Sequence, residues 1–342
     1  MRTDKRIICF ISLSINAMSS DKIDDKKISS PEPVGRFAPS PSGRMHLGNV
    51  TTALLSWLSV RKRGGRWVLR IEDLDPQRSK PEYARQLEDD LHWLGIDWDE
   101  GGIDGIGEHG PYCQSLRHDF YEEALAKLRA EGVVYSCTCR RADLMATQAP
   151  HASDGRIVYS GRCRPAIRPP FNEPLKENAA VRLFVPDGEV TFTDGIRGRQ
   201  CVNLARECGD FVLRRADGAW AYQLAVVADD AAMGVTEVLR GNDLLLSAAQ
   251  QIYLYRLLGY PIPEYVHTPL LCNAAGQRLS KRDASMSMEA LRAAYKSDEV
   301  IGQAALAAGI IKEYMPVSAQ TLVSIYNRDS ITRSICVNCA QR

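Results

Sequence analysis

Residues 34–49 read VGRFAPSPSGRMHLGN. The segment predicts a short strand at Arg36–Ala38, ended by a turn rich in proline and glycine. After the turn, apolar residues recur near the helical period, at Leu47, Val50, Leu54 and Leu58. A turn between a strand and the start of a helix presents free backbone N–H groups and the positive end of the helix dipole, which favour a phosphate. Gly43 and Gly48 allow a nucleotide to approach the backbone closely, and His46 adds a hydrogen-bond donor.

The alternation of strand and helix continues outward from this segment. Trp67–Ile71 is typical of a buried strand, and a helical stripe of apolar residues runs from Tyr83 to Leu94. A further helix is expected at Leu116–Leu128, followed by a strand at Val133–Tyr135. This order predicts an α/β fold with a doubly wound parallel sheet.

The pattern changes after residue 139. Arg140–Pro174 has few apolar residues and cannot form a core of its own, so we expect a staple there. Val181–Leu213 is typical of antiparallel strands, and the apolar run Tyr222–Val227 predicts another strand. A helix is expected at Leu244–Leu258, and mostly helices from Asp283 to about Ile311.

The composition is that of a globular protein. Apolar residues make up 45% of the 342 residues and charged residues 25%, which excludes wholesale disorder and a fibrous protein. Lys and Arg number 43 against 42 Asp and Glu, so a nucleic-acid partner has to be held by a local patch or by shape. Apolar runs stay shorter than the ~20 residues of a membrane span, and we expect a cytoplasmic protein with no membrane partner.

Residues 1–33 differ from the rest of the chain. Basic residues precede an apolar run from Ile7 to Ile15, and Ser19–Ser30 is polar and charged. A secretory signal is one interpretation, with Ala17 before the cleavage site. We expect a disordered leader instead, because the apolar run is short and the polar stretch has little to bury.

A second candidate segment reads RLSKR, from Arg278 to Arg282. Its Lys281, flanked by a serine and arginines, is suited to reach a triphosphate. By itself such a segment is an ordinary solvated basic loop, and a lone His46 is an ordinary structural histidine. Only the two segments taken together indicate a nucleotide-binding site.

Together they resemble the HIGH and KMSKS motifs of class I aminoacyl-tRNA synthetases. HIGH corresponds to His46–Asn49 and KMSKS to Arg278–Arg282, and both depart from the ideal at their ends. Four other segments resemble the glutamyl branch of these enzymes: Arg36–Gly43, Ile71–Arg78, Gly110–Arg117 and Tyr222–Leu245. The resemblance implies the Rossmann-like core of these synthetases.

The chemistry of glutamate agrees with this resemblance. Arg36 and Arg240 can clamp its two carboxylates with bidentate geometry, and Glu72 can hold its ammonium group. The alternative is an internal ion pair between Arg240 and Glu72, with Tyr222 in the core. The resemblance implies that the glutamate-binding residues are Arg36, Phe37, Ala38, Pro39, Ser40, Glu72, Tyr222 and Arg240. It implies that the ATP-binding residues are His46, Gly48, Asn49 and Lys281, of which His46 and Lys281 are catalytic.

The ten cysteines are too dilute for a disulfide scaffold, but two close pairs suggest metal binding. Cys137, Cys139 and Cys163 offer three thiolates, which suit zinc, and the oxygen of Tyr159 can be the fourth ligand, although tyrosine is a rare one. This spacing resembles the glutamyl-Q tRNA(Asp) synthetases, shortened paralogues of glutamyl-tRNA synthetases without the anticodon-binding domain. For the other pair, Cys336 and Cys339, we expect a loose tail rather than a second metal site.

The motifs divide the chain into five parts. We expect a leader at 1–33, the two halves of the nucleotide-binding catalytic core at 34–136 and 214–283, a zinc-containing insertion with connecting strands at 137–213, and a helical stem region and tail at 284–342. The residues after Arg282 are too few for an anticodon-binding domain.

The resemblance implies a ligase reaction in two steps. ATP, with Mg²⁺, would activate glutamate without tRNA, and the glutamyl group would then move to queuosine in the anticodon of tRNA(Asp). We expect one structural zinc per chain, a monomer, and an RNA-binding patch at the Arg-rich stretch 156–168. Two alternatives stay open: a compact glutamyl-tRNA synthetase that charges the 3′ end, and a non-catalytic synthetase-like binding protein.

Overall fold

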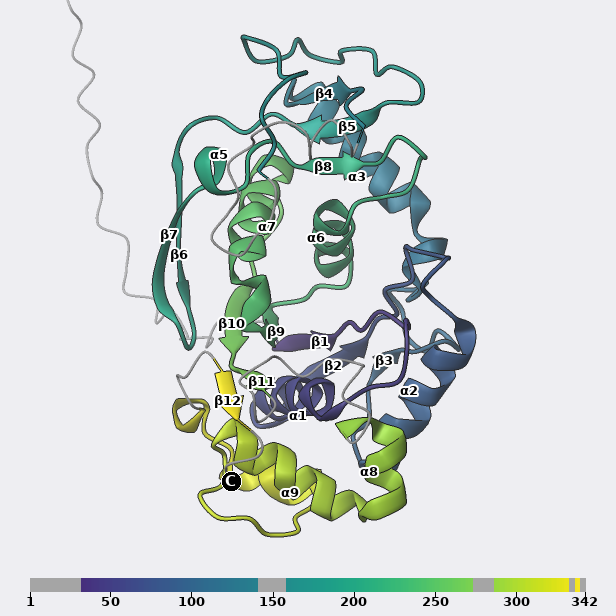
Figure 1. The fold of residues 1–342 in the computed structure, drawn as a ribbon, viewed down its shortest axis with the longest axis vertical. Helices are drawn as coiled ribbons and strands as arrows, with labels where there is room; N and C mark the ends of the chain where they lie inside the picture. Colours follow the sequence, from purple (N-terminus) through teal and green to yellow (C-terminus); the bar gives the residue numbers. More distant parts are fainter. Residues whose placement is uncertain (1–31, 141–157, 273–285, 332–335, 339–342) are drawn as a thin grey trace, which may run out of the picture. The chain divides into compact units, whose positions relative to one another are not determined.

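The computed structural model describes residues 32–140, 158–272 and 286–331, and the backbone of 336–338 (Figure 1). Residues 1–31 of the predicted leader and residues 273–285, which include Lys281, lie outside this description. The elements named below all belong to the unit Glu32–Arg342.

A seven-stranded sheet forms the centre of the fold. Its strands lie in the order β3 (Glu100–Gly101), β2 (Arg66–Leu69), β1 (Val34–Phe37), β9 (Glu237–Gly241), β10 (Glu264–Thr268), β6 (Glu189–Asp194) and β7 (Gly198–Asn203). Neighbouring strands are parallel except β6 and β7, which form an antiparallel hairpin at one edge. The chain passes from β1 outward to β3 and later continues on the other side of β1 through β9 and β10. The predicted doubly wound parallel sheet is therefore confirmed.

The reversal of strand order between β1 and β9 determines where a ligand can bind. In doubly wound sheets the connections after two such strands diverge and leave a crevice at their carboxyl ends. β1 leads into the proline- and glycine-rich turn, and β9 leads into the 3₁₀ turn η2 (Asn242–Leu244). The predicted phosphate-binding turn thus begins at the crevice.

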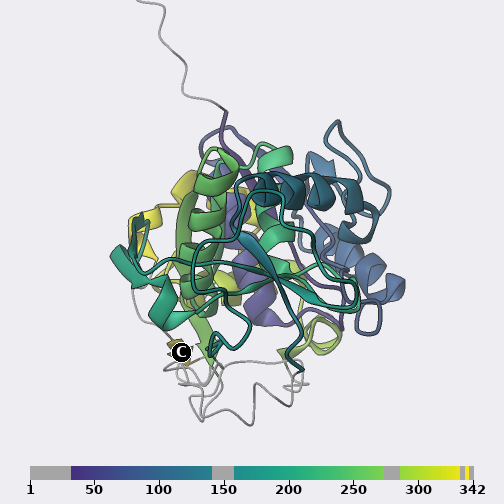
Figure 2. The same ribbon diagram turned by 90° about the horizontal axis from the view of Figure 1, so that it is seen from above.

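Helices cover both faces of the sheet. One buried apolar cluster draws on α1 (Leu47–Arg61), α2 (Pro81–Trp93), α8 (Met288–Ala294), α9 (Ser297–Ala308) and α10 (Ala319–Ile325). A second cluster draws on α3 (His118–Ala130), α6 (Tyr222–Ala232) and α7 (Leu245–Leu258). Figure 1 shows α1, α8 and α9 below β1 and α2 beside β3, whereas α3, α6 and α7 lie above β1; the view from above has α3 and α7 in front of α1 (Figure 2).

The predicted strand at Tyr222–Val227 is wrong, because these residues form the first half of α6. The segment Leu224–Asp230 is buried throughout, including the two aspartates at its end. A helix that is buried on all sides has no apolar stripe, so its short apolar run is indistinguishable from a buried strand by period alone.

The stretch between the two halves of the core divides between two sheets. β4 (Val134–Cys137), β5 (Ala180–Leu183) and β8 (Val212–Arg214) form a separate three-stranded antiparallel sheet, whereas β6 and β7 join the main sheet. A short helix α5 (Leu204–Glu207) follows β7. The antiparallel strands predicted between Val181 and Leu213 are therefore observed.

The predicted loose tail is wrong for residues 336–338. They form β12 (Cys336–Asn338), which pairs in parallel with β11 (Leu270–Cys272). Two further 3₁₀ turns, η1 (Gln114–Leu116) and η4 (Arg328–Ser330), complete the described elements. Among the described residues, the helices lack the length and apolar character needed to cross a membrane.

Candidate active site

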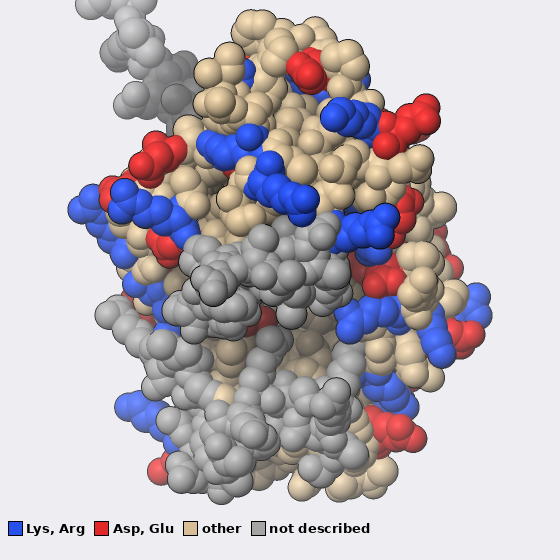
Figure 3. Space-filling model, turned by 45° about the horizontal axis from the view of Figure 1, so that its top comes forward, with Lys and Arg blue, Asp and Glu red and all other residues tan. Residues whose placement is uncertain are grey.

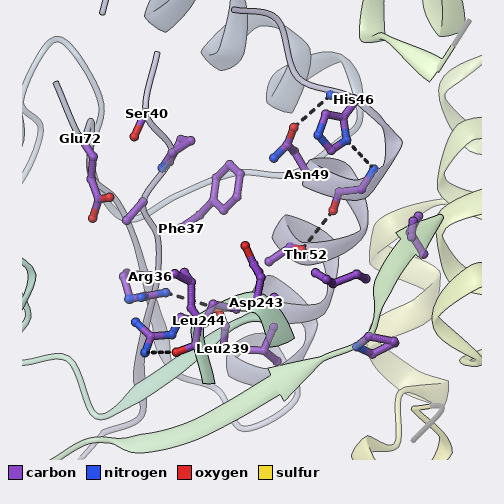
Figure 4. A pocket seen from close by; sticks show the side chains of 18 of the residues that line it. Arg36, Phe37, Ser40, His46, Asn49, Thr52, Glu72, Leu239, Asp243 and Leu244 are labelled. Atoms are coloured by element: carbon purple, nitrogen blue, oxygen red, sulfur yellow. Dashed lines mark hydrogen bonds between the residues drawn. The ribbon is translucent and has the colours of Figure 1, made fainter. Parts of the chain in front are cut away.

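A pocket of about 400 Å³ opens at the crevice between β1 and β9 (Figure 4). It brings together every predicted substrate-binding residue that the structure describes: Arg36, Phe37, Ala38, Pro39, Ser40, His46, Gly48, Asn49, Glu72, Tyr222 and Arg240. In Figure 4, Arg36 and Glu72 lie on one side of the pocket and His46 and Asn49 on the other. Residues from both halves of the chain thus form one site with two chemically different ends.

His46 begins α1 and closes its first turn. Its Nδ1 accepts a hydrogen bond from the Gly48 backbone N–H at 3.1 Å, and the Asn49 Oδ1 accepts one from the His46 N–H at 3.1 Å. Since Nδ1 accepts, a neutral His46 carries its proton on Nε2, as a donor. Gly48 is required beside the ring, because a Cβ atom at Gly48 would lie 2.9 Å from His46 Cε1. The first turn of α1 contains no acidic residue, so this end of the pocket favours an anion.

A buried set of charges orients the opposite end. Arg70 donates to Asp230 Oδ1 at 2.6 Å and to Glu72 Oε1 at 3.1 Å. Arg36 lies 3.6 Å from the same Asp230 oxygen through Nε and donates to the Leu239 carbonyl at 3.3 Å. Burial raises the pKa of Glu72 in spite of Arg70 and Arg36. Glu72 is therefore held in place by Arg70, and the alternative of an Arg240–Glu72 ion pair is not what the structure has.

The set extends behind the pocket through Asp229. This carboxylate accepts hydrogen bonds from Arg117, Gln114 and Tyr121, all buried. Three arginines thus balance three carboxylates in this cluster: Arg36, Arg70 and Arg117 with Glu72, Asp229 and Asp230. Sequence reasoning gave no role to Arg70, Asp229 or Asp230. The signal was present, since two adjacent aspartates end an apolar segment.

Arg240, at the end of β9, is held by neutral acceptors. It donates through Nε to His267 Nε2 at 3.1 Å, through one terminal nitrogen to Gln251 Oε1 at 2.8 Å, and through the other to the Leu244 carbonyl at 3.2 Å. Its charge remains available to the pocket, because no carboxylate of the described residues forms an ion pair with it. Tyr222 is half-buried and lines the same pocket rather than the core.

The predicted metal ligands also come together. The Sγ atoms of Cys137, Cys139 and Cys163 lie within 4.8 Å of one another, and the Tyr159 hydroxyl lies 3.5 Å from Cys137 Sγ and 3.9 Å from Cys139 Sγ. Burial raises the pKa of Cys139 to about 11, whereas for Cys163 hydrogen bonds from Thr138 and Cys139 outweigh burial and lower the pKa to about 7. The three thiols could hold a metal ion.

The Arg-rich stretch 156–168 contributes less to an open RNA patch than predicted. Arg164 pairs with the buried Asp210 and lies 3.9 Å above the Phe184 ring, and Arg168 donates to the carbonyls of Gly132 and Glu131. Arg168 thus binds the insertion to the residues that follow α3, whereas Arg164 bonds within the insertion, and Arg156 lies outside the described residues. Figure 3 shows Lys and Arg side chains across the upper part of one face of the molecule.

Comparisons with known proteins agree with this geometry. The family model described as "tRNA synthetases class I (E and Q), catalytic domain" matches residues 34–340. A glutamyl-Q tRNA(Asp) synthetase of Symbiobacterium thermophilum is 50% identical over 306 residues, which cover 87% of this chain and 94% of that protein. One from Nitratidesulfovibrio vulgaris is 46% identical over 295 residues, covering 85% and 91%.

A solved structure is similar as well. The crystal structure of a glutamate tRNA ligase from Elizabethkingia meningosepticum in complex with its amino acid superposes with a TM-score of 0.75 at 27% identity. The match covers 90% of this chain and 67% of that one.

Proposed function

The chain belongs to the class I tRNA synthetase family of the glutamate and glutamine type, and we propose that it attaches glutamate to queuosine in the anticodon of tRNA(Asp). It is a ligase of the aminoacyl-tRNA synthetase class. The observation that carries the proposal is the pocket that Arg36, Glu72, Tyr222 and Arg240 line together with His46 and the start of α1.

In the first step, an α-carboxylate oxygen of glutamate attacks the α-phosphorus of ATP and pyrophosphate leaves. Arg36 and Arg240 bind the carboxylates of glutamate, and Glu72 binds its ammonium group. The His46 Nε2–H and the N-terminus of α1 stabilise the charge that develops on the phosphate oxygens. Lys281 would assist, and Mg²⁺ bound with ATP would supply further neutralisation of the phosphate charge. Positioning and electrostatics therefore account for the step without a side-chain nucleophile.

In the second step, a hydroxyl oxygen of queuosine attacks the activated carbonyl and AMP leaves, which gives a glutamyl ester. We propose that activation precedes tRNA binding, because the described pocket already brings together the residues assigned to glutamate. We propose that the protein acts in this way as a cytoplasmic monomer.

We propose zinc as the metal of the cysteine cluster. Thiolates around a tetrahedral zinc with bonds of about 2.3 Å lie about 3.8 Å apart. The 3.5 Å between Cys139 Sγ and Cys163 Sγ is close to this value, and the Tyr159 oxygen completes four donors. Such a site supplies folding energy rather than chemistry, because it staples the polar insertion to β4.

Transfer of labelled glutamate tests the proposal. The purified protein is given ATP, glutamate and either full-length tRNA(Asp) with queuosine, the same tRNA without it, or an isolated queuosine-bearing anticodon hairpin. We expect labelling of the first and third substrates, and ATP–pyrophosphate exchange with glutamate in the absence of RNA. Labelling of the unmodified tRNA at its 3′ end would identify a compact glutamyl-tRNA synthetase instead. Absence of exchange with every amino acid would indicate a binding protein.

A further inference from the structure

Three neighbouring strands place an aspartate, a histidine and Arg240 in a buried row. β6, β10 and β9 lie side by side in the main sheet, and Asp194, His267 and Arg240 occupy their carboxyl ends. His267 Nδ1 lies 2.6 Å from Asp194 Oδ2, and its Nε2 accepts the Arg240 Nε–H at 3.1 Å. All three side chains are at most 4% exposed. The row leads from the edge hairpin of the sheet to the pocket.

The row fixes the tautomer of His267. Asp194 is an acceptor only, so the imidazole proton lies on Nδ1 and the Nε2 lone pair faces Arg240. Burial and the charge of Arg240 lower the pKa of His267 in spite of Asp194 and the Leu244 carbonyl, and the hydrogen bond with His267 lowers the pKa of Asp194 in spite of burial. The charges along the row are therefore minus, neutral and plus. With the opposite tautomer, two N–H groups would face each other between His267 and Arg240.

The row also determines which part of Arg240 remains for a ligand. A guanidinium group has five N–H donors. His267, Gln251 and the Leu244 carbonyl use one on each nitrogen, which leaves one N–H on each terminal nitrogen. Two N–H groups on neighbouring nitrogens match the two oxygens of a carboxylate. The acceptors around Arg240 thus set the direction of its remaining fork.

We propose that Asp194 and His267 are positioning residues for the amino-acid substrate: Asp194 holds His267 in the Nδ1–H tautomer, and His267 aims the Arg240 guanidinium at a substrate carboxylate. The identity of that substrate as glutamate rests on the proposed function. The inference also gives the β6–β7 hairpin a role, because it supplies Asp194 to the catalytic core.

Asp194→Asn tests the tautomer with little change in shape. Asp194 Oδ1 accepts the backbone N–H groups of Ile196 at 3.0 Å, Arg197 at 2.8 Å and His267 at 3.3 Å, so the amide oxygen of an asparagine stays there. Its NH₂ group then points at His267 Nδ1 and forces the imidazole proton onto Nε2, against Arg240. In ATP–pyrophosphate exchange we expect the KM for glutamate to rise about tenfold or more, while the KM for ATP changes less than about twofold.

Asp210→Asn is the matched control. Asp210 is as buried as Asp194, at 2% exposed, and it also accepts a backbone N–H, from Val185, but it lies just before β8 in the insertion and not in this pocket. Loss of a buried carboxylate lowers the melting temperature in both variants, but only Asp194→Asn should separate the two KM values. His267→Gln should keep both KM values close to those of the wild-type protein, because its amide can donate to Asp194 and accept from Arg240. His267→Leu should behave like Asp194→Asn. An unchanged KM for glutamate in folded Asp194→Asn and His267→Leu would overturn the proposal.

¹⁵N NMR of the imidazoles decides the tautomer without any substrate. The His267 signals are assigned by their loss in His267→Gln, and at pH 7 we expect a neutral ring with the proton on Nδ1. A charged ring, or a proton on Nε2, in the wild-type protein would refute the proposal whatever the kinetics. If exchange with glutamate fails but the Nδ1–H tautomer is present, the proposed substrate is wrong, and the positioning of Arg240 by Asp194 and His267 is still supported.

Discussion

Glu72→Gln should weaken glutamate binding without lowering stability. Glu72 is 9% exposed, and burial raises its pKa, so its charge is disfavoured in the folded protein. The glutamine oxygen can still accept the hydrogen bond that Arg70 now donates to Glu72 Oε1 at 3.1 Å. The substitution removes a buried charge and leaves that bond in place. The substitution leaves three arginines against two carboxylates in the cluster, but the raised pKa of Glu72 offsets this loss, so we expect a free energy of unfolding close to that of the wild-type protein.

The effect on binding should be larger. A hydrogen bond between the carboxylate and the substrate ammonium contributes about 1.5–3 kcal/mol, which corresponds to a rise of about 10- to 150-fold in the KM for glutamate. Urea unfolding and glutamate-dependent ATP–pyrophosphate exchange measure the two quantities. The KM for ATP should not change.

Glu88→Gln is the control for this experiment. Burial also raises the pKa of Glu88, which accepts the Ile103 backbone N–H at 2.5 Å outside the pocket. It should show the same trend in stability and an unchanged KM for glutamate. If Glu72→Gln binds glutamate as well as the wild-type protein does, Glu72 is a structural partner of Arg70 and not an ammonium ligand. If it unfolds much more easily, its charge stabilises the arginine cluster and the expectation for stability is wrong.

Three further outcomes are expected. Because the pKa of Glu72 is raised, its carboxylate takes up a proton at a higher pH than an ordinary glutamate does. The KM for glutamate should therefore rise as the pH is lowered from 7 to 4.5 in exchange assays. This pH dependence should vanish in Glu72→Gln. Lys281→Ala should raise the barrier to adenylate formation by about 2–4 kcal/mol with little effect on glutamate binding, and an unchanged exchange rate would contradict the assignment of the lysine loop. Metal analysis of protein purified without chelator should find one zinc per chain, lost on substitution of any thiol ligand and retained best in Tyr159→Phe; protein without zinc would refute the site, whose thiols are Cys137, Cys139 and Cys163.

Residue patterns alone predicted those parts of the site that are local, whereas the distant residues Glu72, Tyr222 and Arg240 were assigned through the family resemblance. The turn between β1 and α1 is one continuous segment, and its residue types are dictated by the strand end, the helix start and the phosphate that both can hold. The spacing of Cys137, Cys139 and Cys163 is also local enough to be read along the chain. In both cases the structure brings the predicted side chains together.

Features that depend on neighbouring strands or on complete burial could not be predicted in this way. Asp194 and His267 are 73 residues apart, and each has an ordinary sequence context. Only the pairing of β6 with β10 brings them together. The helix α6 was missed for a related reason, because burial on all sides removes the polar face that distinguishes a helix from a strand.

The strand order of the main sheet has a consequence for synthesis in the cell. Arg36 in β1 bonds to Leu239 in β9, 203 residues later in the chain, and β9 also completes the pocket through Arg240. At about 5–20 residues per second, a ribosome needs about 10–40 s to add the intervening segment. During that time one edge of β1 is unpaired, and such an edge can recruit other chains. A nascent chain therefore gains its amino-acid pocket late, and shielding by a chaperone is most valuable in the interval before β9 emerges.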